Sequence, residues 1–77
     1  SSNLKFSHLV SLMNLVLSEN NLTIVKKIYF NLNKNLFNLY LNNNFIETIE
    51  YESFSNNLNL RLLDLRNNRL KFFTGVF

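Results

Sequence analysis

The chain has 77 residues, enough for one small domain, and a mild net charge of +3. It contains no cysteine, which excludes a disulfide framework and a thiolate metal site. Its longest apolar runs are far shorter than the ~18 residues that a membrane span needs, and its first residues do not resemble a signal peptide. No run of like charges is long enough to predict binding to nucleic acid or to a membrane surface.

One pattern recurs along the chain with a period of 24 residues and no insertion. It reads L-x-x-L-x-L-x-x-N-x-L, and the third copy, at 60–70, matches it best. We therefore divide the chain into a partial repeat at 1–11, full repeats at 12–35 and 36–59, and a partial repeat at 60–77. Leucine recurs at position 1 (Leu12, Leu36, Leu60), position 4 (Leu15, Leu39, Leu63) and position 6 (Leu17, Leu41, Leu65). Apolar residues recur at position 11 (Leu22, Ile46, Leu70) and position 14 (Val25, Ile49, Phe73). Asparagine recurs at position 9 (Asn20, Asn44, Asn68), and phenylalanine at position 19 (Phe6, Phe30, Phe54).

Each copy changes its pattern partway through. The L-x-L core alternates with a period of two, which predicts a short strand with leucine on one face. The back half, such as 23–35, lacks a sustained helical period and predicts an irregular arc, turns or a short helical turn. One strand per copy, always in the same direction, predicts a parallel sheet that grows by one strand per copy. The leucines of neighbouring copies then stack between the sheet and the arc, because one copy cannot bury its apolar face alone.

The asparagine and phenylalanine columns have separate predicted roles. After each strand the chain must bend while its buried peptide groups keep hydrogen-bond partners. An inward amide offers donors and an acceptor, so Asn20, Asn44 and Asn68 are predicted to form a structural ladder with the backbone. The alternative, that asparagine is simply common in this chain, does not account for the regular spacing. The phenylalanine column predicts a buried stack; an exposed, ligand-binding stripe is the alternative.

Together these columns resemble the leucine-rich repeat family over essentially the whole chain. The 24-residue length with phenylalanine at position 19 is similar to the extracellular-type repeats of Toll-like receptors and insect adhesion proteins. The resemblance implies an α/β-type solenoid with a short parallel sheet on its concave face and irregular or short helical convex segments. It also implies an apolar residue at position 22, which Leu9 supplies but Asn33 and Asn57 do not. We expect Leu32 and Leu58, one residue to either side, to compensate.

The resemblance places positions 3, 5, 7 and 8 of each copy on the concave, solvent-facing side of the sheet. Tyr40 is central there, with Val16 and Asp64 on either side, and Arg66 offers a charge-assisted bond to a carboxylate. Tyrosine and arginine are enriched in binding hot spots; the alternative is a hydrated sheet face without a ligand. The candidate ligand-binding residues are Asn14, Val16, Ser18 and Glu19, then Asn38, Tyr40, Asn42 and Asn43, then Leu62, Asp64, Arg66 and Asn67.

No combination of residues indicates catalysis, a cofactor or a metal site. His8 is the only histidine and lies in the back half of the first copy, away from the carboxylates of the predicted concave face. Glu47, Glu50 and Glu52 fall in one back arc, where a solvated edge is favoured over a metal site. Asn21 begins the sequence Asn-Leu-Thr, a candidate N-glycosylation site, although a chance match is expected in a chain so rich in asparagine.

These features predict a non-enzymatic module that binds a protein ligand, as an internal fragment of a longer receptor, adhesion or matrix protein. Structural spacer repeats, or repeats that select substrates for an enzyme domain outside this chain, are the alternatives. The resemblance indicates an extracellular or cell-surface location. A cytoplasmic one is the alternative, because the cysteine-rich caps of extracellular members are missing. Uncapped solenoid ends also favour self-association.

Overall fold

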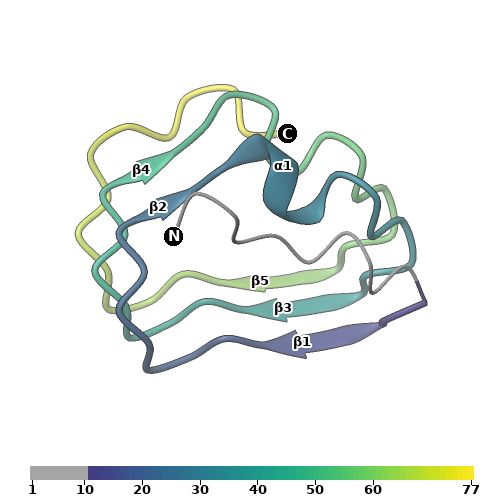
Figure 1. The fold of residues 1–77 in the computed structure, drawn as a ribbon, viewed down its shortest axis with the longest axis horizontal. Coiled ribbons are helices and arrows are strands. Elements are labelled where there is room, and N and C mark those ends of the chain that lie inside the picture. The colour runs from purple at the N-terminus through teal and green to yellow at the C-terminus, as the bar shows by residue number, and fades with distance from the viewer. Residues whose placement is uncertain (1–10) are drawn as a thin grey trace.

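Three short parallel strands form one side of the molecule (Figure 1). The structure is a computed structural model, and it describes residues 11–77. The strands β1 (Asn14–Val16), β3 (Asn38–Tyr40) and β5 (Leu62–Asp64) pair in the order β1-β3-β5. Leu15 lies opposite Leu39, and Leu39 opposite Leu63, so every paired residue is 24 positions from its partner. The sequence period therefore sets the register of the sheet.

A second, smaller sheet lies across the molecule from the first (Figure 1). It consists of β2 (Ile24–Val25) and β4 (Thr48–Ile49), which are also parallel, and a bridge between Thr48 and Phe72 extends it toward the third copy. The helix α1 (Lys27–Phe30) follows β2. The short helical turn was predicted, but the second sheet was not. Within residues 11–77 no helix is long and apolar enough to cross a membrane.

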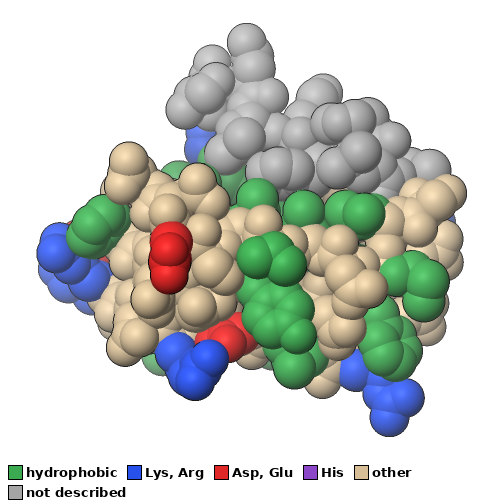
Figure 2. Space-filling view, turned by 90° about the horizontal axis from the view of Figure 1, so that it is seen from below, with side chains coloured by type: hydrophobic (Ala, Val, Ile, Leu, Met, Phe, Trp, Pro, Cys, Tyr) green, Lys and Arg blue, Asp and Glu red, His purple; other side chains and the backbone are tan. Residues whose placement is uncertain are grey.

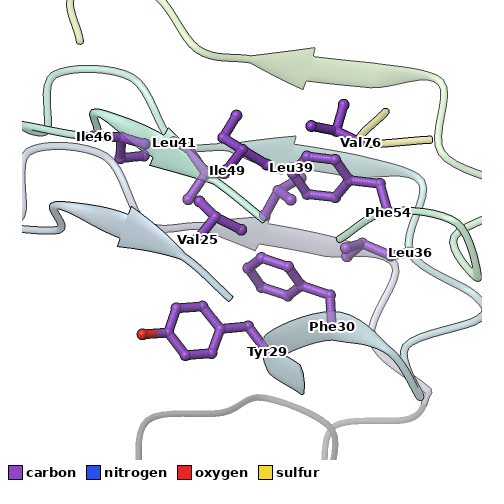
Figure 3. Packing of buried hydrophobic residues seen from close by; sticks show 10 residues of the cluster. All are labelled: Val25, Tyr29, Phe30, Leu36, Leu39, Leu41, Ile46, Ile49, Phe54 and Val76. Carbon is purple, nitrogen blue, oxygen red and sulfur yellow. The ribbon is translucent and has the colours of Figure 1, made fainter. Parts of the chain in front are cut away.

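The core lies between the two sheets and is complete only in the middle copy (Figure 3). Leu36, Leu39, Leu41 and Ile46 have no exposed surface, because a neighbouring copy covers them on each side. Their equivalents in the outer copies are only partly buried: Leu15, Leu17, Leu22, Leu60, Leu63, Leu65 and Leu70. The leucine columns are therefore confirmed as the core. Position 14 departs from this in the third copy, where Phe73 is 52% exposed while Val25 and Ile49 are buried.

The phenylalanine column is a buried stack, as predicted. Phe30 and Phe54 lie nearly parallel with ring centroids 6.1 Å apart, and both are buried (Figure 3). Phe77 comes one residue early in its copy and contacts Phe54 with ring centroids 5.8 Å apart, but its ring is tilted by 38° and it is 74% exposed. Gly75 makes the turn before it with a φ of 68°, and a Cβ there would lie 2.6 Å from the Tyr51 ring. The predicted first member, Phe6, lies outside the described residues.

The expectation that Leu32 and Leu58 compensate for polar residues at position 22 is wrong. Leu32 is 52% exposed and Leu58 is 87% exposed, whereas Asn33 and Asn57 are buried. The Nδ2 of Asn57 donates to the carbonyl oxygens of Phe30 at 3.0 Å and Asn33 at 2.9 Å. Each of these carbonyls also accepts a backbone N–H, from Asn33 and from Leu36 respectively, so the Asn57 amide supplies a second donor to both, which a leucine could not do. Leu9, in the first copy, lies outside the described residues.

Candidate functional site

The strand register gathers the outward side chains of the three copies into rows across one face of the sheet. Figure 2 shows this face, with hydrophobic side chains in a band and acidic and basic groups beside it. Residues at the same position of neighbouring copies are paired neighbours or directly follow paired residues. The rows are Asn14, Asn38 and Leu62; Val16, Tyr40 and Asp64; Ser18, Asn42 and Arg66; and Glu19, Asn43 and Asn67. All twelve candidate residues therefore lie on or at the end of this face.

The apolar part of the face is formed by Val16, Tyr40 and Leu62. Val16 is 65% exposed and Leu62 is 39% exposed, while Tyr40 is half-buried between its partners Val16 and Asp64. Neighbouring strands are ~4.8 Å apart, so Tyr40 on the central strand is within reach of both Val16 and Leu62, which lie on the strands to either side of it. Exposed apolar side chains on a preformed sheet lose little conformational entropy on binding, which favours their use as contacts.

Polar side chains on this face are tied to one another across the strands. The Oγ of Ser18 donates to the Oδ1 of Asn42 at 2.7 Å, and the Nδ2 of Asn38 donates to the Oδ1 of Asn14. Because these pairs are 24 residues apart, each bond joins two neighbouring copies. The bonds hold the amides in one orientation, so the polar part of the face is ordered before any ligand arrives.

The row at the ends of the strands has an unusual backbone conformation. Glu19, Asn43 and Asn67 have φ values of 57°, 60° and 59°, in the left-handed region that asparagine tolerates better than most residues. The Nδ2 of Asn67 donates to the Oδ1 of Asn43 at 2.9 Å. The same turn recurs every 24 residues, and it fixes where the sheet face ends.

The guanidinium of Arg66 is already paired within the chain, although its side chain is 79% exposed. Its Nη2 lies 2.8 Å from the Oδ2 of Asp64, and its Nε donates to the Oδ1 of Asp64 at 3.0 Å. These hydrogen bonds lower the pKa of Asp64 below its ordinary value, and they raise the pKa of Arg66. Arg66 lies just past the end of β5, and its backbone N–H also donates to the Oδ1 of Asp64 at 3.1 Å, so the turn brings the two side chains together. The pair leaves this corner of the face nearly neutral.

The asparagines at position 9 hold the turns behind the sheet face. The Nδ2 of Asn44 donates to the carbonyls of Leu17 and Leu41, both at 3.0 Å, and its Oδ1 accepts the N–H of Leu22 at 3.1 Å. Asn68 repeats this arrangement with the next copy: its Nδ2 donates to Leu41 and Leu65, and its Oδ1 accepts the N–H of Ile46. Asn20 is exposed and donates to the carbonyls of Leu17 and Ser18.

The three glutamates of the middle back arc are engaged with basic residues and the backbone. Glu52 lies 3.2 Å from the Nζ of Lys27, and Glu47 lies 3.7 Å from the Nζ of Lys71. Glu50 accepts the backbone N–H of Lys27 at 2.7 Å. Among residues 11–77 no group of acidic, histidine or cysteine side chains is arranged to hold a metal ion. His8 lies outside this part of the chain.

The continuous register, the two parallel sheets and the asparagine bonds define a tandem-repeat protein in which each copy adds one strand. A family model described as leucine rich repeat matches residues 34–77, which is more than half of the chain. The chain belongs to the leucine-rich repeat family. Comparisons with curated proteins and with solved structures gave no match. Members of the family typically act through protein interactions rather than catalysis, so the chain is of a class suited to protein interaction.

Proposed function

We propose that this chain is a non-enzymatic protein-binding module, and that it contacts its ligand through the face of β1, β3 and β5. In this proposal it is an internal part of a longer receptor, adhesion or matrix protein. There, further copies extend the sheet into a solenoid whose concave side carries the ligand. The face offered by three strands is narrow compared with the roughly 800 Å² per partner of a standard interface, so neighbouring copies contribute to binding in the full protein.

The observation that carries this proposal is the exposed apolar band of Val16, Tyr40 and Leu62 within an ordered polar surround. An exposed apolar group loses water favourably when a partner covers it. Half-buried tyrosine is a frequent hot-spot residue, because it adds large contact area at a low entropic cost. The amides held across the strands form a polar rim around this apolar centre, and they can supply hydrogen bonds to a ligand.

Site-specific photo-crosslinking in the cells that make the protein tests the sheet face. A benzoylphenylalanine placed at Tyr40 is expected to crosslink a partner protein. The same group placed at Tyr51 is the matched control, because Tyr51 is 68% exposed and lies beyond β4, across the molecule from the sheet face. Replacing Val16 and Leu62 with serine is expected to remove the crosslink from position 40.

Two other results would contradict the proposal in different ways. A partner crosslinked equally well from positions 40 and 51 would show that the sheet face is not selective. The absence of any crosslink from position 40, in a full protein that still binds its partner, would favour spacer repeats. If the crosslinked partner is chemically altered by a domain outside this chain, the repeats select substrates for an enzyme.

We also propose that this segment is extracellular, and the sequence Asn21-Leu22-Thr23 provides a test. Asn21 and Thr23 are exposed, in the connection between β1 and β2, where a transferase has access. Secretion through a eukaryotic cell is expected to add a glycan that a glycosidase removes, seen as a mass shift. Thr23→Val, which destroys the acceptor sequence, is the control. A secreted parent chain with no such shift would contradict the use of this site.

A further inference from the structure

An open groove of about 520 Å³ lies where the three strands of the larger sheet begin. This is the right-hand end of β1, β3 and β5 in Figure 1, because all three arrows point to the left. The residues before the strands line it: Met13, Phe37 and Arg61 precede β1, β3 and β5, and Leu58, Asn35 and Asn59 lie beside them. The groove shares no residue with the twelve candidates of the sheet face.

The floor of the groove is ordered, and its lining combines exposed apolar side chains with polar ones. The backbone N–H of Phe37 donates to the carbonyl of Met13 at 2.7 Å, and the N–H of Arg61 donates to the carbonyl of Phe37 at 2.8 Å. The groove is thus built on the same backbone ladder as the sheet. Leu58 is 87% exposed and Met13 is 54% exposed. The volume falls in the ~300–1,000 Å³ range of ligand pockets.

The charge around the groove is positive and unbalanced. The guanidinium of Arg61 lies 5.3 Å from the centre of the Phe37 ring, and it makes no ion pair with a described residue. Lys34 is exposed and directly precedes the lining residue Asn35, and its carbonyl accepts the Nδ2 of Asn59, another lining residue, at 3.1 Å. Its ammonium likewise has no carboxylate partner in residues 11–77.

All five acidic side chains of the chain lie elsewhere. Glu47 and Glu52 pair with Lys71 and Lys27, and Asp64 pairs with Arg66. Glu50 accepts the backbone N–H of Lys27, and Glu19 follows β1 at the far end of the sheet. No acidic side chain therefore lines the groove or neutralises its two cations.

We propose that this groove docks an extended segment of a partner protein in which an acidic residue adjoins a bulky apolar one. The carboxylate pairs with Arg61, and a guanidinium already held on an aromatic ring loses little freedom when it binds a carboxylate; Lys34, next to a lining residue, adds positive charge. The apolar side chain packs between Met13 and Leu58. This is a second contact surface, separate from the sheet face. It selects acidic segments because no carboxylate of residues 11–77 neutralises the positive charge of Arg61.

Selection from a displayed library of short random peptides on the immobilised 77-residue chain tests the proposal. Enriched peptides are expected to carry aspartate or glutamate next to leucine, isoleucine or phenylalanine. Measured with a selected peptide synthesised alone, Arg61→Glu is expected to weaken binding by about tenfold or more, since it replaces a charge-assisted bond with repulsion. Leu58→Ser, at an exposed site where the fold does not depend on leucine, is expected to weaken it as well.

Arg69→Glu is the matched control for the charge change. Arg69 lies 4.8 Å from the centre of the Phe45 ring in the same kind of contact, but beyond the opposite ends of the strands. It is expected to leave peptide affinity unchanged, and equal melting temperatures of the variants confirm that each is folded. The proposal is overturned if nothing is enriched, if enriched peptides lack an acidic residue, or if Arg61→Glu and Arg69→Glu act alike. Arg61-dependent binding to phosphatidylserine vesicles without peptide enrichment would overturn it in favour of a lipid surface.

Discussion

Leu39→Ala is expected to lower the free energy of unfolding by about 2–5 kcal/mol. Leu39 has no exposed surface and lies on the central strand β3, with Leu15 and Leu63 paired to it on either side. Truncation removes the transfer free energy of the side chain and leaves a cavity that the two neighbouring copies cannot close. A chain of this size has only a small stability to lose, so the variant is expected to be largely unfolded. Urea denaturation followed by circular dichroism measures the change, and Leu41→Ala is expected to behave alike.

Leu63→Ala is the control for this first prediction. It is the same substitution at the same position of the next copy, but on the edge strand β5, where the side chain is only partly buried. It is expected to cost clearly less than Leu39→Ala, because less surface returns to water and the site relaxes more easily. Equal losses for the two variants would mean that the middle copy is not the centre of the core.

Asn44→Ala is expected to lower the free energy of unfolding by about 2 kcal/mol, since one backbone N–H loses its acceptor, at a cost of ~1–3 kcal/mol, and two further hydrogen bonds to carbonyls are lost. The amide of Asn44 is 4% exposed and bonds the carbonyls of Leu17 and Leu41 and the N–H of Leu22. Alanine removes all three bonds at once: the N–H of Leu22 is left without its acceptor, while the carbonyls of Leu17 and Leu41 keep the Nδ2 groups of Asn20 and Asn68 as donors. Thermal and urea unfolding of the purified variant give the size of the effect.

Two substitutions test whether the position-9 asparagines have a structural role or whether asparagine is simply common in this chain. Asn20→Ala changes an exposed asparagine whose bonds are local, so a loss of only a few tenths of a kcal/mol is expected. Asn44→Asp keeps the acceptor for Leu22 but loses both donors and buries a charge, so it is expected to be at least as damaging as alanine. If Asn20→Ala and Asn44→Ala were equally mild, the amides would not hold the turns.

The period of the sequence was enough to predict most of the fold. Leucine every 24 residues predicted the parallel sheet and its register, because a parallel pair of identical copies can align only when equivalent residues face each other. The second sheet was missed because β2 and β4 have two residues each, too short for a visible alternation. Asn33 and Asn57 recur with the same period as Asn20 and Asn44, which was a signal for a second set of buried amides. The signal was missed because the family favours an apolar residue at this position.

The sequence was enough to predict where the candidate site residues lie, but less so which of their side chains are already bonded to one another. Register alone places Val16, Tyr40 and Asp64 in one row, and the structure has them paired. The bond between Asp64 and Arg66 depends on side-chain conformation, although an aspartate two residues before an arginine in a turn was an available signal. The groove at Arg61 was missed because residues just before a strand have no periodic pattern of their own. Its volume and unbalanced charge exist only once the copies stack.

The buried polar groups of residues 11–77 are all neutral: Asn33, Asn44, Ser53 and Asn57. The amide of asparagine and the hydroxyl of serine do not titrate, so these four buried groups do not make stability depend on pH. The lowered pKa of Asp64 stabilises the folded chain above the ordinary aspartate range, and this is lost as pH falls through the lowered value. Burial raises the pKa of Tyr29, which favours the fold below the ordinary tyrosine range and is lost as pH rises through the raised value.

The buried polar contacts are made by neutral groups, whereas salt screens exposed charges such as Lys34 and Arg61 and the exposed ion pairs of Lys27 with Glu52 and of Lys71 with Glu47. Ionic strength therefore tunes the contacts that Lys34 and Arg61 make with a partner far more than it affects the neutral bonds of the core.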